Sequence, residues 1–432
     1  MIATLATAYR DGSRSPTDEV RAALAAIAAD EPRLNAVATL LSEQAMAAAA
    51  TAERELRSGH DRGPLHGVPV GVKDLFAISG VTTKFGADPA FYETPAQDSA
   101  VVARLRAAGA VIVASTQMLE FAAGAVNPLV GQTNNPRDPS RTSGGSSGGS
   151  VALVAAGHVP VAVGTDTGGS IRIPAAYCGV VGFKPSFGAI DLAGALPLSW
   201  TLDHAGPIAV NVADTRLLFQ ALAGLVEPPR PLSMCGLRVG VIAAHRDAAC
   251  VAANARAAFV GGVDRLRYAG AVVSDVTLPD LEHVSSALIL IIAPEAYVIH
   301  ARRLAHGADR MAASTRLQLD AGATIPAAAY LRALQFRRRF IGAMAAAFAS
   351  VDVLLSPTVP FEAPAEDPPI EQDGGSDEML CTAPANLAGL PAITLPCGAS
   401  EAGLQFGLHL TGAAGQDARL LDIAAAIEAA LV

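Results

Sequence analysis

The chain has 432 residues and a formal net charge of −9, from 31 Lys and Arg against 40 Asp and Glu. Only 16% of its residues are charged, against roughly 25% in an average globular protein, and 51% are hydrophobic. This composition excludes a disordered chain and a coiled coil, and the acidic balance argues against a nucleic-acid-binding surface. A chain of this length buries a large core, so the fold needs no disulfide or metal.

Cysteine usage and the N-terminal segment indicate where the protein works. The five cysteines are an odd number without CxxC spacing, and the nine histidines include no HExxH pair, so a structural zinc site is not expected. The N-terminus lacks the basic and apolar regions of a signal peptide. The most apolar run, residues 287–299, contains Pro294 and Glu295 and is shorter than the roughly 20 residues of a membrane span. We expect a cytoplasmic protein with no cofactor, no metal and no membrane contact.

The first predicted helix begins near Ser15. This residue can cap the helix, Pro16 fits its first position, and Asp18 places an acid in its first turn. Ala-rich, helical sequence continues from there to about residue 57.

Strands and helices alternate in the next part of the chain. Apolar runs at residues 68–72 and 110–114 predict buried strands, and residues 99–108 predict a helix closed by Gly109. This rhythm predicts an α/β fold, in which a large sheet is covered by helices on both faces.

Beyond residue 230 the sequence becomes mainly helical. Residues 237–243 and 271–276 read as strands around a helix, and residues 284–348 as helices. The acidic, Pro- and Gly-rich segment 361–378 is expected to be a surface loop and a candidate lid. The remaining strands and the closing helix are predicted at residues 351–355, 392–395, 406–410 and 418–431.

Two clusters of Gly, Ser and Thr lie close together in the middle of the chain. They are GGSSGGS at residues 144–150 and GTDTGGS at residues 164–170. A flexible linker has a similar composition. However, apolar segments without charge runs flank the first cluster, and a related cluster returns after only one predicted helix and strand. We therefore interpret both clusters as parts of a functional site.

Two common glycine-rich motifs fit these clusters poorly. No GxxxxGK[ST] or GxGxxG pattern follows a strand, so nucleotide binding is not expected. GGSSGG matches the GxSxG elbow of α/β-hydrolases at Ser146 and at Ser147, but that elbow needs a strand directly before the serine. His204 or His409 would have to be its partner, and neither has an acid in the expected chain order. An esterase of this type stays a distant alternative.

A serine nucleophile with a lysine base accounts for both clusters. Successive glycines let backbone amides of the second cluster converge as an oxyanion hole, with Ser170 beside them as the nucleophile. Lys73 ends the apolar run GVPVGVK and is the candidate base. Burial lowers a lysine pKa from about 10.4, which lets the neutral amine accept a proton near pH 7. A salt bridge between Lys73 and Asp74 or another acid is the structural alternative.

Longer strings of the sequence resemble the amidase signature family, the Ser–cis-Ser–Lys amidohydrolases. Looser similarity continues to the C-terminus, so the resemblance runs from about residue 15 to the end. The matching strings are GVPVGVKD at 67–74, GGSSGGS at 144–150, GTDTGGSIRIPAAYCGVVGFKPS at 164–186 and LDHAGP at 202–207, then VLLSPTVP at 353–360 and NLAGLPAITLP at 386–396.

The resemblance implies the fold and the domain organisation. The expected fold is α/β, with a large mixed β-sheet covered by helices on both faces. Residues 1–432 would form a single amidase domain, in which about 230–350 is a variable, mainly helical region on the substrate side.

The resemblance also implies the roles of individual residues. The base falls on Lys73, the bridging serine after a cis peptide bond on Ser146, and the nucleophile on Ser170. Asp166 and Arg172 are expected to brace the loop, with substrate binding by Arg172 as the alternative. The oxyanion-hole amides fall on Thr167, Gly168, Gly169 and Ser170. Residues expected along the substrate pocket, on weaker grounds, are Met118, Leu119, Phe121, Trp200 and His409.

The implied reaction is hydrolysis of a small-molecule amide to a carboxylate and ammonia or an amine, through an acyl-enzyme on Ser170. Two alternatives within the family stay open. One is the glutamine-hydrolysing subunit of a tRNA-dependent amidotransferase, and the other is a urea- or biuret-type amide hydrolase. The oligomeric state also stays open, with a homodimer as one arrangement.

The sequence departs from the family pattern near its C-terminus. Many relatives carry a Pro-x-Gly-Leu-Gln run, whereas residues 403–412 read GLQFGLHLTG. Gln405 replaces the usual proline and His409 the usual glutamine, so the local pocket wall is expected to differ. A packed core histidine is the alternative for His409.

Overall fold

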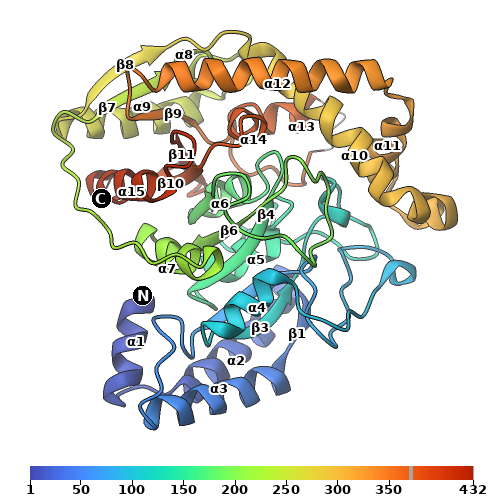
Figure 1. Cartoon of the computed structure of the whole chain (residues 1–432), viewed down its shortest axis with the longest axis vertical. Helices are drawn as coiled ribbons and strands as arrows, with labels where there is room; N and C mark the ends of the chain where they lie inside the picture. The colour runs from blue at the N-terminus through green and yellow to red at the C-terminus, as the bar shows by residue number, and fades with distance from the viewer. Residues whose placement is uncertain (369–372, 432) are drawn as a thin grey trace.

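The structure is a computed structural model of the chain that describes residues 1–368 and 373–431. A mixed sheet with strand order β1-β3-β2-β4-β6-β5-β10-β11-β9-β7-β8 runs through it (Figure 1). The strands are β1 Val37–Leu40, β2 Pro69–Lys73, β3 Val111–Thr116, β4 Val161–Asp166, β5 Val181–Lys184, β6 His204–Ala209, β7 Arg238–Ile242, β8 Val272–Val276, β9 Val353–Pro357, β10 Ala392–Ala399 and β11 Gln405–Thr411.

Parallel and antiparallel pairs both occur in this sheet. Strands β3, β2 and β4 are parallel, as are β9, β7 and β8. The pairs between β4 and β9 in the strand order are antiparallel. The predicted large mixed sheet is therefore confirmed.

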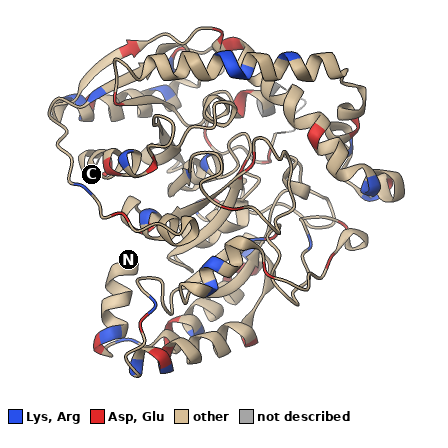
Figure 2. Cartoon of the chain, viewed as in Figure 1, with Lys and Arg blue, Asp and Glu red and all other residues tan. Residues whose placement is uncertain are grey.

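Helices cover the sheet. They are α1 Ile2–Asp11, α2 Pro16–Leu34, α3 Ser42–Arg57, α4 Ala100–Ala107, α5 Gly148–Ala155, α6 Arg172–Cys178, α7 Val212–Ala223, α8 Ala243–Arg246, α9 Ala253–Tyr268, α10 Val284–Gly307, α11 Ala313–Thr324, α12 Ala327–Ala347, α13 Asp373–Glu378, α14 Ala383–Leu387 and α15 Asp417–Leu431. Basic and acidic residues are interspersed over the outer helices, while the central strands carry few (Figure 2).

Alternating side chains of the strands build the core on both faces of the sheet, because successive strand residues point in opposite directions. In β3, Val111 and Val113 pack in a cluster with residues of α2, α3 and α5. Ile112, between them, packs in another cluster with residues of α4, α7, α9 and α15. Helices α6, α10, α12 and α14 contribute to a third cluster. The central strands are thus buried on both faces, as the apolar runs predict.

Local sequence signals located most elements to within a few residues. Ser15 caps α2, and its side chain accepts a hydrogen bond from the Asp18 amide. Strand β1, by contrast, interrupts sequence that looked continuously helical. Asn35 adopts a left-handed conformation with φ of 50° and ends α2, and Glu31 then accepts from the amides of the next two residues. The chain therefore leaves the helix and enters an edge strand.

The predicted loop at residues 361–378 differs in part. Its last residues form the short helix α13, and residues 369–372 lie outside the described part of the chain. The lid stays a prediction.

The helical stretch Leu281–Arg310 satisfies the length and composition of a membrane span, with a mean hydropathy of 1.7. It is longer than the apolar run seen in the sequence, because Pro294 lies within α10 without ending it. Glu295 is buried and accepts hydrogen bonds from Ser199 Oγ at 2.6 Å and the Tyr330 hydroxyl at 2.9 Å. A core helix of a globular enzyme passes the same test, and these contacts hold α10 against the rest of the protein.

Candidate active site

Lys73 is the last residue of β2, a strand that lies between β3 and β4 and is buried along its whole length. Its Nζ donates hydrogen bonds to Ser146 Oγ at 2.7 Å and Thr165 Oγ1 at 2.9 Å. Burial lowers the pKa of Lys73 to about 7, against the opposing pull of the Asp166 and Asp203 carboxylates. The neutral and protonated amine are therefore both populated near pH 7.

Asp74 does not pair with Lys73. Its carboxylate accepts hydrogen bonds from the amides of Lys84 at 2.8 Å and Phe85 at 2.9 Å, and from Ser115 Oγ. The salt bridge considered from the sequence is therefore replaced by two hydroxyl partners of Lys73.

The first Gly/Ser cluster forms a crowded turn before α5. The peptide bond between Gly145 and Ser146 is cis. A Cβ atom on Gly145 would lie 2.1 Å from Leu119 Cδ1, so any larger residue must displace that side chain. The amide of Ser147 donates to the carbonyl of Ser170 at 3.2 Å, which ties this cluster to the second one.

The second cluster leads from β4 into α6. Gly169 has a φ of 150°, and a Cβ atom there would lie 2.5 Å from both Ile173 Cδ1 and Thr382 Oγ1. Within the described residues, the amides of Gly168, Gly169 and Ser170 donate no hydrogen bond to the protein. Amides without a protein partner beside a serine hydroxyl are available to donate hydrogen bonds to an oxyanion.

Arg172 lies fully buried beneath this loop and does not line the cavity described below. Its guanidinium forms two bonds of 2.9 Å to the Asp166 carboxylate. Burial opposes ionisation of Asp166, but the charge and hydrogen bonds of Arg172 outweigh it and hold the pKa of Asp166 below its usual value. The remaining partners of Arg172 are the Thr382 carbonyl at 3.0 Å, Asn386 Oδ1 at 2.5 Å and His409 Nε2 at 2.8 Å.

His409 belongs to this buried network. Its Nδ1 lies 3.3 Å from Ser356 Oγ, and its Nε2 faces Arg172. Because Arg172 can only donate, His409 must accept at Nε2 and is therefore neutral. Burial and the neighbouring Arg172 charge lower the pKa of His409 well below its usual value, in agreement with a neutral ring.

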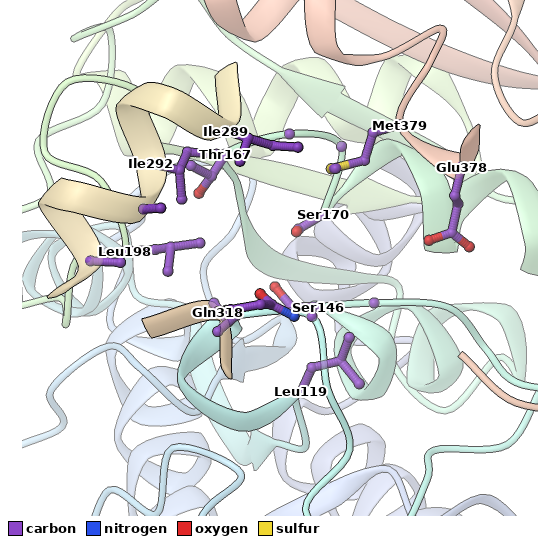
Figure 3. A pocket seen from close by; sticks show the side chains of 18 of the residues that line it. Leu119, Ser146, Thr167, Ser170, Leu198, Ile289, Ile292, Gln318, Glu378 and Met379 are labelled. Carbon is purple, nitrogen blue, oxygen red and sulfur yellow. The ribbon is translucent and has the colours of Figure 1, made fainter. Parts of the chain in front are cut away.

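A cavity of about 250 Å³ opens over the two clusters. Figure 3 shows Ser170 and Ser146 near its middle, with Thr167 and Leu198 toward one end and Met379 and Glu378 toward the other. The other lining residues are Leu119, Ala122, Ala123, Gly124, Gly145, Gly168, Gly169, Ile173, Ile289, Ile292, Ala293, Ala296, Leu317, Gln318, Leu319, Ala321, Asp367 and Pro368. The wall is mainly apolar, and α10 and α11 supply a large part of it.

The structure distributes the predicted pocket residues over four places. Leu119 lines the cavity. Trp200, half exposed, lines a second cavity next to it. Met118 and Phe121 are buried in the main core, where Phe121 packs in an aromatic cluster. His409 is buried in the Arg172 network. These last three side chains do not reach the cavity, because neighbouring side chains already enclose them.

Sequence reasoning missed several residues of the site. Thr165 holds Lys73, and Asp203 accepts a hydrogen bond of 2.6 Å from Thr167 Oγ1. Asp203 lies in the LDHAGP string, which was the available signal for it. The apolar wall that includes Ile289 and Leu317 lies in the region expected on the substrate side, but no motif singled out either side chain.

Comparisons with known proteins match the chain to amidases and to subunits of glutamyl-tRNA(Gln) amidotransferases. The Amidase family model matches residues 18–421. An amidase from Pseudomonas putida is 36% identical over 412 residues, which cover 90% of this chain and 87% of that protein. A glutamyl-tRNA(Gln) amidotransferase subunit from Anaeromyxobacter dehalogenans (strain 2CP-C) is 37% identical over 96% of this chain and 92% of that protein. A crystal structure of an amidase matches with a TM-score of 0.91 and 36% identity, over 99% and 98% of the two chains.

The chain belongs to the Amidase family, as its matching strings predict. It is an amidase, and its fold is that of the amidase signature enzymes.

Proposed function

We propose that the protein hydrolyses small, uncharged carboxamides through an acyl-enzyme on Ser170, with Lys73 as the base and Ser146 as the bridge between them. The observation that carries this proposal is the 2.7 Å contact between Lys73 Nζ and Ser146 Oγ, made by a fully buried lysine whose pKa lies near 7. A buried amine without a carboxylate partner is poised to take up a proton.

In this mechanism neutral Lys73 accepts the proton of Ser146, and Ser146 accepts the proton of Ser170. Ser170 Oγ attacks the amide carbonyl carbon, and the developing oxyanion binds to the free amides of the second cluster. Ser146 then protonates the nitrogen, the C–N bond breaks, and the amine leaves. Water attacks the resulting ester, releases the carboxylate and restores Ser170.

Asp166 and Arg172 act in this proposal as positioning residues. Asp166 Oδ2 accepts from the amide of Ile171, and Arg172 holds the Asp166 carboxylate from below. Thr382 Oγ1 donates to the Gly168 carbonyl at 2.6 Å, which supports the orientation of the loop amides. Thr167, whose hydroxyl is held by Asp203, completes the expected oxyanion loop with Gly168 and Gly169.

The cavity wall supports an apolar acyl group. Among the described residues that line it, none is Lys or Arg, and so no side chain there offers a cationic partner to the carboxylate of glutamine. This favours a free amidase over a glutamine-hydrolysing subunit, although relatives of the second kind are equally similar in sequence. Urea and biuret would leave most of an apolar cavity of about 250 Å³ unfilled. Neither histidine considered for an esterase triad lines the cavity, which favours lysine as the base.

The arrangement of the chain supports the remaining parts of the proposal. We propose one catalytic domain, with about residues 230–350 as the substrate-side region, because α10 and α11 line the cavity. All five cysteines are free, which fits a reducing, cytoplasmic location.

The test is release of ammonia by the purified chain from primary amides, among them butanamide, benzamide, glutamine and urea. Butanamide or benzamide should be cleaved without any partner protein, and Ser170→Ala should abolish both this activity and labelling by a fluorophosphonate. Labelling that persisted in Ser170→Ala would move the nucleophile to Ser146. Release from glutamine alone, or only with partner proteins, would favour the amidotransferase function.

A further inference from the structure

We propose that Glu120 is a positioning residue of the substrate cavity, whose carboxylate joins two walls of that cavity and thereby determines how well the enzyme binds long acyl groups. This inference rests on the proposed function and deepens it, since it names the group that sets selectivity for the acyl chain. Glu120 is fully buried and is not among the residues that line the cavity. It therefore acts through its neighbours.

The first of the two walls is the loop at residues 119–124. Its amide at Leu119 donates to the carbonyl of Ser146 at 3.3 Å, so the loop lies directly against the bridging serine. The loop residues that line the cavity are Leu119, Ala122, Ala123 and Gly124.

The second wall is helix α11. Figure 3 shows one side chain from each wall, Leu119 and Gln318. The residues of α11 that line the cavity are Leu317, Gln318, Leu319 and Ala321.

The Glu120 carboxylate connects the loop to the start of α11. Its Oε2 accepts a hydrogen bond from the amide of Ala312 at 2.9 Å, and its Oε1 accepts one from Asn127 Nδ2 at 2.6 Å. Ala312 is the N-cap residue of α11, and its own methyl side chain cannot accept from the helix. Glu120 thus supplies an acceptor and a negative charge to this helix start from 192 residues away in the chain.

The loop needs such support, because its backbone is strained beside the carboxylate. Phe121 and Ala122 have φ values of 50° and 61°, a conformation that residues other than glycine rarely adopt. A strained backbone of this kind persists only where the surrounding contacts hold it. Ala122 is also a cavity residue, so a loop that relaxed here would change the cavity wall.

The hydrogen bonds of this joint require a carboxylate. Asn127 Oδ1 accepts from the amide of Leu129 at 3.0 Å, which fixes the Asn127 amide with its Nδ2 toward Glu120. Both partners of Glu120 are therefore N–H donors. Glu120→Gln has one acceptor oxygen and one NH2 group, so it can satisfy only one of them. Adding Asn127→Asp restores the pairing, because the new NH2 group then faces a carboxylate.

The test measures kcat and KM for acetamide and hexanamide in the full chain. A long acyl group gains binding energy from apolar contact with both walls, whereas a methyl group makes few such contacts. We expect Glu120→Gln to raise KM for hexanamide by about tenfold or more and to leave kcat for both amides within about twofold, because binding is lost equally in the ground state and the transition state. KM for acetamide should change by less than about twofold. The double variant, Glu120→Gln with Asn127→Asp, should bring KM for hexanamide back to within about twofold of the wild type.

Glu31→Gln is the matched control. The Glu31 carboxylate likewise accepts from two N–H donors, the amides of Ala36 at 3.1 Å and Val37 at 3.0 Å, but it does not line the cavity or touch either wall. This variant should lower the Tm while the ratio of the two KM values stays that of the wild type.

The inference would be overturned by any of three results: an equal loss for both amides in Glu120→Gln, no recovery in the double variant, or the same change of KM ratio in Glu31→Gln. Failure of the wild type to cleave any amide would instead defeat the proposed function, and the inference with it. Should Glu120→Gln not fold, Asn127→Ala removes one donor and keeps the carboxylate on Ala312. It should raise KM for hexanamide alone by about threefold or more, and an unchanged KM would overturn the inference.

Discussion

The sharpest prediction concerns the pH dependence conferred by Lys73. If this lysine is the base, only its neutral form starts the reaction, and kcat/KM for a neutral primary amide must rise with pH and level off above the lysine pKa. With that pKa near 7, kcat/KM should be half-maximal near pH 7, and one pH unit below this midpoint it should be about tenfold lower than its plateau at high pH.

The size of the effect follows from the burial of Lys73. A fall in pKa from 10.5 to about 7 corresponds to about 5 kcal/mol in favour of the neutral amine, compared with the same side chain in water. Without this fall only about one molecule in 3,000 would hold the neutral base at pH 7. Lys73→Met, which keeps the length of the side chain but has no amine, should lose several orders of magnitude in kcat.

The assay is kcat/KM for butanamide between pH 5 and 9 at two temperatures. Asp203 and Asp74, whose pKa values burial raises to about 6, also titrate in this range. Temperature separates them, because an ammonium group ionises with a large enthalpy and a carboxyl group with a small one. The midpoint should therefore fall on warming. A flat profile, or a midpoint that does not move with temperature, would refute the lysine-base reasoning.

Further predictions test the loop and its supports. Gly169→Ala should lower kcat strongly and destabilise the fold by about 1–3 kcal/mol, because the added Cβ would meet Ile173 and Thr382 at 2.5 Å; unchanged kinetics and an unchanged Tm would contradict this. His409→Leu should cost about 1–3 kcal/mol by leaving a buried N–H of Arg172 without an acceptor, whereas His409→Gln should retain most of the stability in a denaturant titration. Equal losses in both His409 variants would show that the acceptor does not matter. As long as the Arg172→Lys variant still folds, its kcat should fall by a larger factor than its KM rises. A change confined to KM would instead mean that Arg172 binds substrate.

Local signals in the sequence were enough to predict the strands and helices next to Lys73 and the two serines. The run ending at Lys73 is apolar throughout, and the structure makes it a strand buried on both faces. The cap at Ser15 and the glycine after the helix at 100–107 placed two further helices. In each case the signal lies within one turn or one strand.

Contacts between segments that lie far apart in the sequence could not be predicted from these local signals. Nothing near Met118 or Phe121 distinguishes a side chain that enters the cavity from one that packs behind it. Leu119 enters because the turn at Gly145 leaves room for it, and the turn is 26 residues away in the chain. The same holds for His409, whose role depends on where Arg172 reaches across the sheet.

In the proposed mechanism, the long-range contacts of Arg172 also determine when a growing chain first gains activity. Its partners Thr382, Asn386 and His409 follow it by 210, 214 and 237 residues. The lysine and both serines leave the ribosome long before these supports exist, so a nascent chain carries the reactive groups without a fixed oxyanion loop. If the loop acts as proposed, hydrolysis therefore requires almost the whole polypeptide, because contacts of such sequence separation form late and slowly.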